Sequence, residues 1–223
     1  MNCISVLQTC LRKMEPDQKH LLKGYNLLLY FAGSMIMNAP TDECIIDFWI
    51  SGRLIKLPVT SSNPRFLKAA SSLRDSCTDK NRCKHLMSDD FFRLFEISGA
   101  PLAPAYASVY LAKQKGNGKY VENVRDFYKA YGWRSRFHEK IAEDHLGIEL
   151  LFLTRLVEKY LILEDEPCRS EMKKEICRFI DQHLLTWVPS WNNDIQEYSQ
   201  TYCYKGIGTL IHASIEDLHG ILS

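Results

Sequence analysis

Residues 139–149 combine four carboxylates with one lysine and one histidine, which gives a local charge of −3 when the histidine is neutral. Asp144 is placed to cap a helix that has His145 in its first turn, and Glu149 follows four residues later on the same face. Acids at a helix N-terminus stabilise it by about 0.3–1 kcal/mol. The same groups could form an acidic edge that receives a cationic peptide, so two interpretations are open.

An apolar partner for this edge would come from side chains earlier in the chain. They are Phe91, Phe95, Leu102, Tyr106 and Tyr110. A peptide with cationic and apolar parts needs carboxylates for charge-assisted hydrogen bonds and a nearby apolar groove. The same five residues are equally compatible with an ordinary core.

Other motifs that could carry chemistry are incomplete. His138 and Glu139 begin an H-E-x-x-H metal motif, but Ala142 stands in place of its second histidine. The stretch 116–119 lacks the upstream glycine and the hydroxyl residue of a phosphate-binding loop, and it predicts a flexible loop. We therefore expect no metal, no cofactor and no catalytic residues.

Eight cysteines are present, and none of them forms a C-x-x-C pair. The two closest in a polar stretch are Cys77 and Cys83, without a second pair to complete a zinc site. In a chain of this size with no secretory signal, reduced thiols are expected. The sequence predicts a cytoplasmic protein.

Composition narrows the function further. The 223 residues carry 28 Lys and Arg against 27 Asp and Glu, so the net charge is +1. Proteins that bind nucleic acids usually carry an excess of basic residues, so we expect this chain to bind no nucleic acid. No apolar run reaches the roughly 20 residues of a membrane span.

The elements that must position these groups are helices. Apolar residues recur at spacings of three and four, as in 17–37 and 144–163, and no alternating strand pattern is found. Helical segments are expected at 17–37, 41–51, 66–73, 88–97, 120–131, 144–163, 170–186 and from 192 to the end. We predict an all-α, compact, single-domain bundle of about eight or nine helices over 1–223.

Several residues should mark where these helices begin and end. Thr41 and Ser88 are candidate N-caps, and Gly132 suits a left-handed C-terminal cap. A break is expected at 187–189 because it contains a proline. Gly206-x-Gly208, inside the last helical segment, predicts close packing or a kink.

Three segments resemble the TorD/DmsD/NarJ-type chaperones. Leu94-Phe95 followed by 100–111 resembles that family's "L-F … P-P-Y-E-S-V-Y" segment, and 143–150 resembles its "P-D-H-x-G-x-E-L" signature. Residues 183–189 resemble its "H-L-x-x-W-x-P" element. The segments occur in the family's order, and the resemblance is clearest over 88–215.

The resemblance implies a TorD-like helical fold and a cytoplasmic, non-enzymatic chaperone for redox-enzyme maturation. Such a chaperone binds the twin-arginine signal peptide and the apo form of a molybdopterin oxidoreductase catalytic subunit. It assists cofactor insertion and delays export. A homodimer is possible, since some members exchange domains.

The resemblance also implies a peptide-binding site. Asp144 and His145 match the family's Asp-His pair, and Ala107 replaces its glutamate. Ala142 and Glu143 stand where many members place a proline. The complete predicted site is Asp144, His145, Glu143, Glu149, Tyr106, Ser108, Tyr110, Pro101, Pro104 and Phe95.

Two other functions are compatible with the residues alone. One is a helical adaptor that binds a partner protein without a leader peptide. The other is a small helical hydrolase that uses His145 with Glu149 or Asp144 for acid–base chemistry. The hydrolase would need a concave pocket at these side chains.

Overall fold

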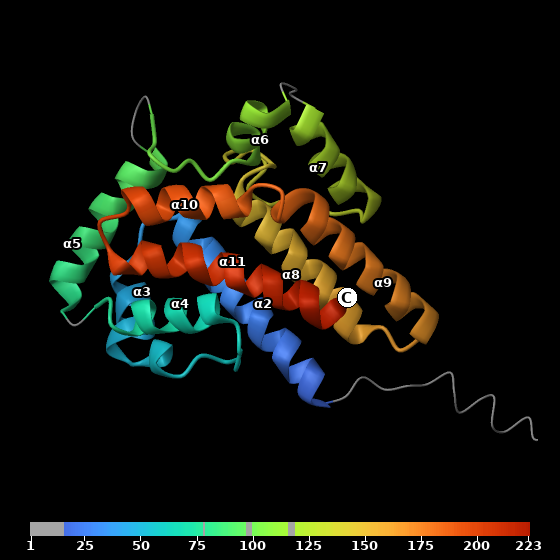
Figure 1. The fold of residues 1–223 in the computed structure, drawn as a ribbon, viewed down its shortest axis with the longest axis horizontal. Helices are drawn as coiled ribbons and strands as arrows, with labels where there is room; N and C mark the ends of the chain where they lie inside the picture. The colour runs from blue at the N-terminus through green and yellow to red at the C-terminus, as the bar shows by residue number, and fades with distance from the viewer. Residues whose placement is uncertain (1–15, 78, 97–99, 116–118) are drawn as a thin grey trace, which may run out of the picture.

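The computed structural model describes residues 16–77, 79–96, 100–115 and 119–223 (Figure 1). Within those ranges the chain forms ten α-helices, and its only β-type pairing is an isolated bridge between Tyr106 and His145. The all-α prediction is confirmed. The helices are α2 (Pro16–Met37), α3 (Asp42–Ile45), α4 (Pro64–Arg74), α5 (Lys80–Phe91), α6 (Ala107–Lys115), α7 (Lys119–Ala130), α8 (Leu146–Ile162), α9 (Glu166–Phe179), α10 (Val188–Tyr198) and α11 (Tyr202–Leu222).

Four short helical turns join or extend these helices. They are η1 (Ile46–Ile50), η2 (Arg53–Ile55), η3 (Phe92–Glu96) and η4 (Ile180–Leu184). The helix number exceeds the expected eight or nine partly because the last predicted segment divides into α10 and α11. Ser199 has extended backbone angles at this division and closes α10.

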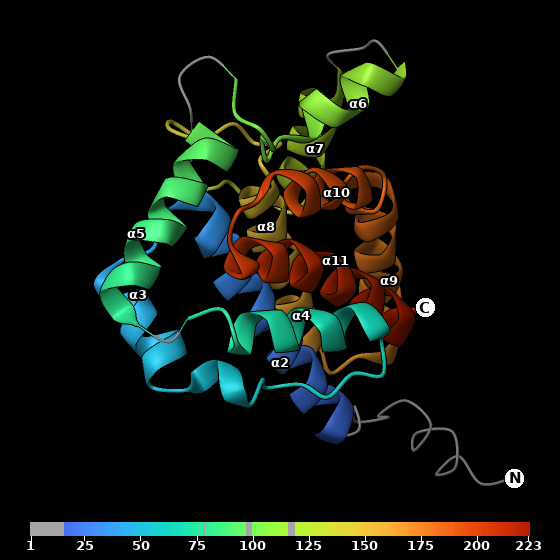
Figure 2. The ribbon, with the colours of Figure 1, turned by 60° about the vertical axis from the view of Figure 1, so that its left-hand side comes forward.

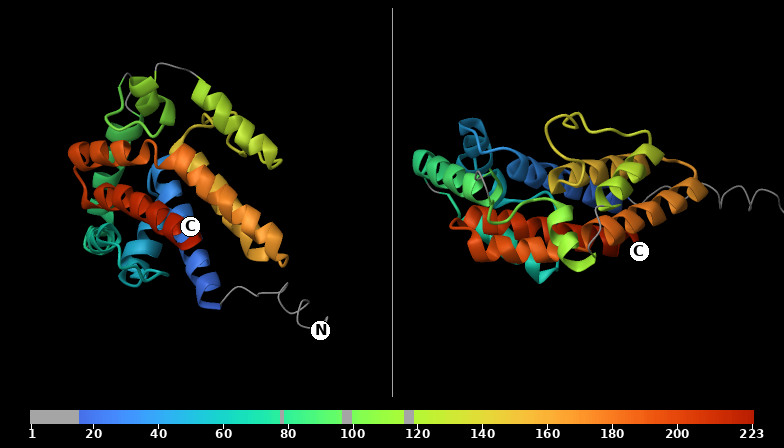
Figure 3. Two further views of the ribbon diagram at one scale, coloured as in Figure 1. Left: turned by 45° about the vertical axis from the view of Figure 1, so that its right-hand side comes forward. Right: turned by 90° about the horizontal axis from the view of Figure 1, so that it is seen from above.

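The C-terminal helix α11 lies at the centre of the fold, against α4, α2 and α10 (Figure 2). Seen from above, α10 and α11 form one layer and α2 and α8 form another (Figure 3). A Cβ atom on Gly206 would come within 2.7 Å of Leu73 Cγ, and one on Gly208 within 2.8 Å of Asn192 Oδ1. The prediction of close packing at these glycines is therefore confirmed.

Most predicted helix ends agree with the structure, and one does not. Thr41 caps α3 by accepting a hydrogen bond from the Cys44 amide at 3.2 Å, and Gly132 adopts a φ of 62° after α7. Ser88 is not an N-cap. The helix containing it begins at Lys80, and Asp79 caps it by accepting from the Arg82 amide at 2.8 Å. Residues 80–86 form the largely exposed first part of α5.

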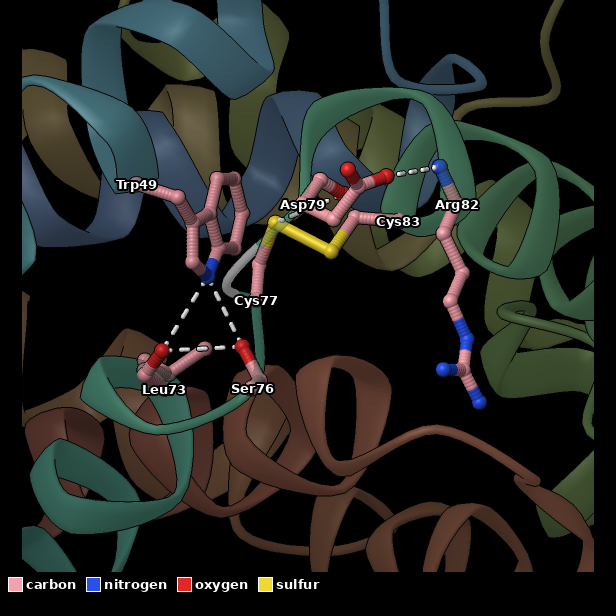
Figure 4. Close-up of a disulfide and its surroundings, with 7 residues drawn as sticks. All are labelled: Trp49, Leu73, Ser76, Cys77, Asp79, Arg82 and Cys83. Carbon is pink, nitrogen blue, oxygen red and sulfur yellow. Dashed lines mark hydrogen bonds between the residues drawn. A yellow bond between two sulfur atoms is a disulfide. The ribbon is translucent and has the colours of Figure 1, made fainter.

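The expectation of reduced thiols is wrong for one pair of cysteines. Cys77 and Cys83 form a disulfide between the turn after α4 and the first part of α5 (Figure 4). The indole of Trp49 donates to the Leu73 carbonyl at 3.0 Å and to Ser76 Oγ at 2.7 Å, which holds the turn beside the disulfide. Cys44, Cys168, Cys177 and Cys203 are free thiols, whereas Cys3 and Cys10 lie outside the described residues.

Helices α6 and α7 lie at one end of the molecule, at the top of Figure 1. Of the predicted loop at 116–119, Lys119 is the first residue of α7, and 116–118 lie outside the described residues. Among the described helices, none has the length and hydrophobicity needed to cross a membrane. The predicted single-domain organisation stays a prediction.

Candidate functional site

The two segments that carry the predicted site meet in space. The Ala107 amide donates to the Asp144 carbonyl at 3.0 Å, and the Leu146 amide donates to the Ala105 carbonyl at 2.8 Å. Together with the Tyr106–His145 bridge, these bonds join the start of α6 to the start of α8. Residues about 40 positions apart in the sequence therefore form one rigid junction.

Asp144 caps a different helix from the one expected. Its side chain is 1% exposed, and its Oδ2 accepts a hydrogen bond at 3.0 Å from the Ser108 amide in the first turn of α6. This contact satisfies an amide that the helix itself leaves unpaired and places a negative charge at the positive end of the helix dipole. The prediction that Asp144 caps the helix following it in sequence is wrong.

His145 is the N-cap of α8. Its Nδ1 accepts from the Gly147 amide at 3.0 Å, so the neutral ring carries its proton on Nε2. The imidazole is 5% exposed and lies edge-on to the Tyr106 ring, with 4.9 Å between ring centroids. Burial lowers the pKa of His145 to about 4, because it penalises the charged form. At neutral pH this histidine is uncharged.

Glu149 is fully buried and poorly supplied with donors. Tyr120 OH lies 3.1 Å from Oε1, and the Trp187 indole nitrogen lies 3.3 Å from Oε2. Both donors make shorter bonds, of 2.8 and 2.7 Å, to the His183 carbonyl. Burial, and then the charge of Asp144, raise the pKa of Glu149 well above its usual range. A protonated Glu149 can donate to the Tyr120 oxygen, whose own proton serves His183.

The expected exposed acidic edge is not found. Asp144 and Glu149 point inward, and Glu143 pairs with Arg125 of α7. Tyr128 OH donates to the Glu143 carbonyl at 3.0 Å, which fixes the backbone at that position. These three carboxylates are close in sequence, but their hydrogen-bond and ion-pair partners lie on other helices. Their roles in peptide binding stay predictions.

The remaining predicted residues divide between core and surface. Tyr110 is buried, stacks on Trp187 and donates to Asp194 at 2.9 Å, while Phe95 packs against Phe91 and Tyr204. The partly exposed members of the predicted set in this region are Pro101, Pro104, Tyr106 and Ser108.

Exposed apolar residues flank Tyr106 in the chain, and an exposed acidic residue acts on it electrostatically. Leu102 and Val109 are each 37% exposed. Tyr106, which lies between them in the sequence, is half-buried. Burial raises the pKa of Tyr106, and the charges of Asp144 and of exposed Glu96 add to the effect. We name Glu96, Leu102, Tyr106 and Val109 the α6 face. Sequence reasoning missed Glu96 and Val109, although Glu96 directly follows the Leu94-Phe95 motif.

A cleft of about 570 Å³ lies between α7 and the loop before α8, and Glu143 is part of its lining. Its charged lining consists of Arg125, Lys129, Arg134 and Glu143, so cations predominate. Neither His145 nor Glu149 lines this cleft. We name it the basic cleft. Among the described residues, no three His, Cys, Asp or Glu side chains are grouped so as to hold a metal ion.

The sequence is similar to those of known proteins. The family model described as nitrate reductase delta subunit matches residues 62–193, which is more than half of the chain. The chain is 32% identical over 130 residues to chaperone protein TorD of Vibrio cholerae serotype O1 (strain El Tor Inaba N16961), covering 58% of this chain and 59% of that protein. It is 26% identical over 155 residues to chaperone protein TorD of Vibrio parahaemolyticus, covering 68% and 72%.

Proposed function

The chain belongs to the nitrate reductase delta subunit family, and from this premise we propose that it is a TorD-type, system-specific chaperone rather than an enzyme. The matched region includes the junction of α6 and α8 and the α6 face. The alignment spans about six tenths of the length of the Vibrio cholerae relative. The activity and partners of this chain are therefore proposals.

The proposed client is the apo catalytic subunit of a molybdopterin oxidoreductase that carries a twin-arginine leader. The chaperone would bind this leader in the cytoplasm, assist cofactor insertion and delay export. A homodimer stays a prediction from the family resemblance.

The observation that carries the leader-binding proposal is the α6 face. Exposed Leu102 and Val109 offer apolar contact beside Tyr106, and Glu96 provides an accessible carboxylate. A twin-arginine leader presents guanidinium groups followed by an apolar stretch, and a carboxylate beside an apolar surface complements both. Asp144 stabilises this surface because its carboxylate accepts a hydrogen bond from an amide in the first turn of α6.

Calorimetry with a synthetic twin-arginine peptide tests the proposal. Wild-type protein should bind the twin-arginine peptide more tightly than a twin-lysine version, since only arginine offers the bidentate fork. Glu96→Gln should weaken binding about threefold, in the range of one exposed ion pair. Glu139→Gln is the matched control. Glu139 is also an exposed glutamate, with its side chain 84% exposed, but it lies in the 139–149 stretch and not on the α6 face. Absence of binding by folded wild-type protein would contradict the proposal.

The structure gives the hydrolase alternative no support. His145 and Glu149 are both buried, and the His145 Nδ1 lone pair is already used by the Gly147 amide. The adaptor alternative predicts equal affinity for the client with and without its leader. A pull-down with a leader-deleted client separates the adaptor from the proposed chaperone.

A further inference from the structure

The basic cleft has a charge opposite to that expected of a leader-binding surface. Arg125 and Lys129 come from one flank of α7, and Arg134 comes from the facing loop. Against these three cations the cleft lining offers one carboxylate, Glu143, so the fixed charges leave +2 when His138 is neutral. A twin-arginine segment would be repelled here, and an anionic ligand would be attracted.

One carboxylate already occupies the cleft. Glu143 is held there by the Arg125 guanidinium, and its backbone is fixed separately by Tyr128. Lys129 pairs with Asp126 on its own helix, at 3.2 Å with both side chains largely exposed. Arg134 is exposed and has no ion-pair partner among the residues that the structure describes. The cleft therefore has cationic capacity that Glu143 does not use.

The donors around the cleft favour carboxylates over phosphate. Phosphate sites usually draw on free amides at a helix N-terminus. Helix α8 begins three residues after Glu143, and its first amides are already used. Leu146 donates to the Ala105 carbonyl, Gly147 to His145 Nδ1, and Ile148 to the His145 carbonyl. What remains is a set of side-chain cations on a helix flank and a loop, which suits an extended acidic peptide.

We propose that the basic cleft between α7 and the 133–143 loop binds an acidic peptide segment of the client protein, at a site separate from the α6 face. Naming the client as the source rests on the proposed function. In this arrangement Glu143 is an internal competitor, since its carboxylate occupies Arg125 until the acidic segment displaces it. The chaperone would then hold a cationic leader and an acidic segment of one client on two surfaces of opposite charge.

The test uses a fluorescein-labelled, glutamate-rich 12-residue peptide and measures its anisotropy with the full chain. Arg134→Ala should weaken binding about threefold to fivefold. Arg136→Ala is the matched control, because Arg136 lies in the same loop but its guanidinium covers the Phe137 ring, 4.8 Å from the centroid, and does not line the cleft. Equal losses in the two variants would overturn the proposal, because they would show nonspecific attraction.

Glu143→Gln gives a test of sign. Removing the competing carboxylate frees Arg125, so the acidic peptide should bind about threefold more tightly, whereas a purely structural role for Glu143 predicts unchanged or weaker binding. Displacement of the peptide by micromolar pyrophosphate would instead indicate a small phosphate ligand and overturn the proposal. Binding of the twin-arginine peptide, measured separately, decides the proposed function independently of these outcomes.

Discussion

Asp90 and Glu149 are both buried carboxylates, at 1% and 0% exposure, but their surroundings differ. Asp90 accepts hydrogen bonds from Ser199 Oγ and Thr201 Oγ1, both at 2.7 Å, and from the Gln200 and Thr201 amides at 3.1 and 2.9 Å. It also pairs with Arg93 at 3.1 Å. Among the described residues, Glu149 has two donors, at 3.1 and 3.3 Å, and both of them also bond the His183 carbonyl.

The difference separates a well-partnered buried carboxylate from a poorly partnered one. Asp90 fastens α5 to the turn between α10 and α11 through hydrogen bonds and its ion pair with Arg93. Glu149 is buried beside Tyr120 of α7 and Trp187, and this burial favours its protonated form. The α10–α11 turn is therefore fixed by charge, whereas the end of the molecule that carries the proposed binding surfaces contains groups sensitive to pH.

The largest effect is expected from Asp90→Ala. The substitution leaves several buried donors and the Arg93 charge without their acceptor, and should lower the free energy of unfolding by about 3–5 kcal/mol. Urea denaturation at pH 7 measures it. Asp89→Ala is the control, because Asp89 is an exposed neighbour that pairs only with exposed His85. A loss below about 1 kcal/mol, the value of a surface pair, would remove the distinction between the two carboxylates.

An intermediate effect is expected from His145 on acidification. Its folded-state pKa of about 4 lies below the ordinary value of 6.5, so the unfolded chain binds the proton more tightly. The stability that depends on neutral His145 is complete above pH 6.5 and is lost as pH falls toward 4, with about 2 kcal/mol lost between pH 7 and 5. His145→Asn keeps an N-cap and should remove this loss in urea denaturation. His85→Asn is the control for the same substitution at an exposed histidine.

The smallest effect at low pH is expected from Glu149→Gln. Burial raises the pKa of Glu149 and favours its protonated form at low pH, so the isosteric amide should change stability there by less than about 1 kcal/mol. Because the folded-state pKa is raised, the stability contributed by the protonated group is lost as pH rises toward that pKa. The variant should therefore gain stability relative to wild type as pH rises above the ordinary glutamate pKa of 4.5. A parallel pH dependence of the two proteins would show that Glu149 titrates alike in the folded and unfolded protein, against this prediction.

Local sequence signals predicted the helices well. The spacing of apolar residues located α2 and α8 almost to their ends, and Gly132 marked the end of α7, because both signals depend on residues within one or two turns. The N-cap prediction for Ser88 was wrong because it also relied on nearby residues alone. A serine before an apolar run resembles a helix start, but the polar residues before Ser88 are already part of α5.

The sequence by itself determined the helical class and brought the acidic residues of 143–149 to the start of one helix. Only the tertiary structure decided what each of them does. Asp144 caps α6, Glu143 pairs with α7, and Glu149 is enclosed by Tyr120 and Trp187. Charge state and capping depend on which donors and how much water lie within a few ångströms, and here those neighbours come from helices 18 to 38 residues away.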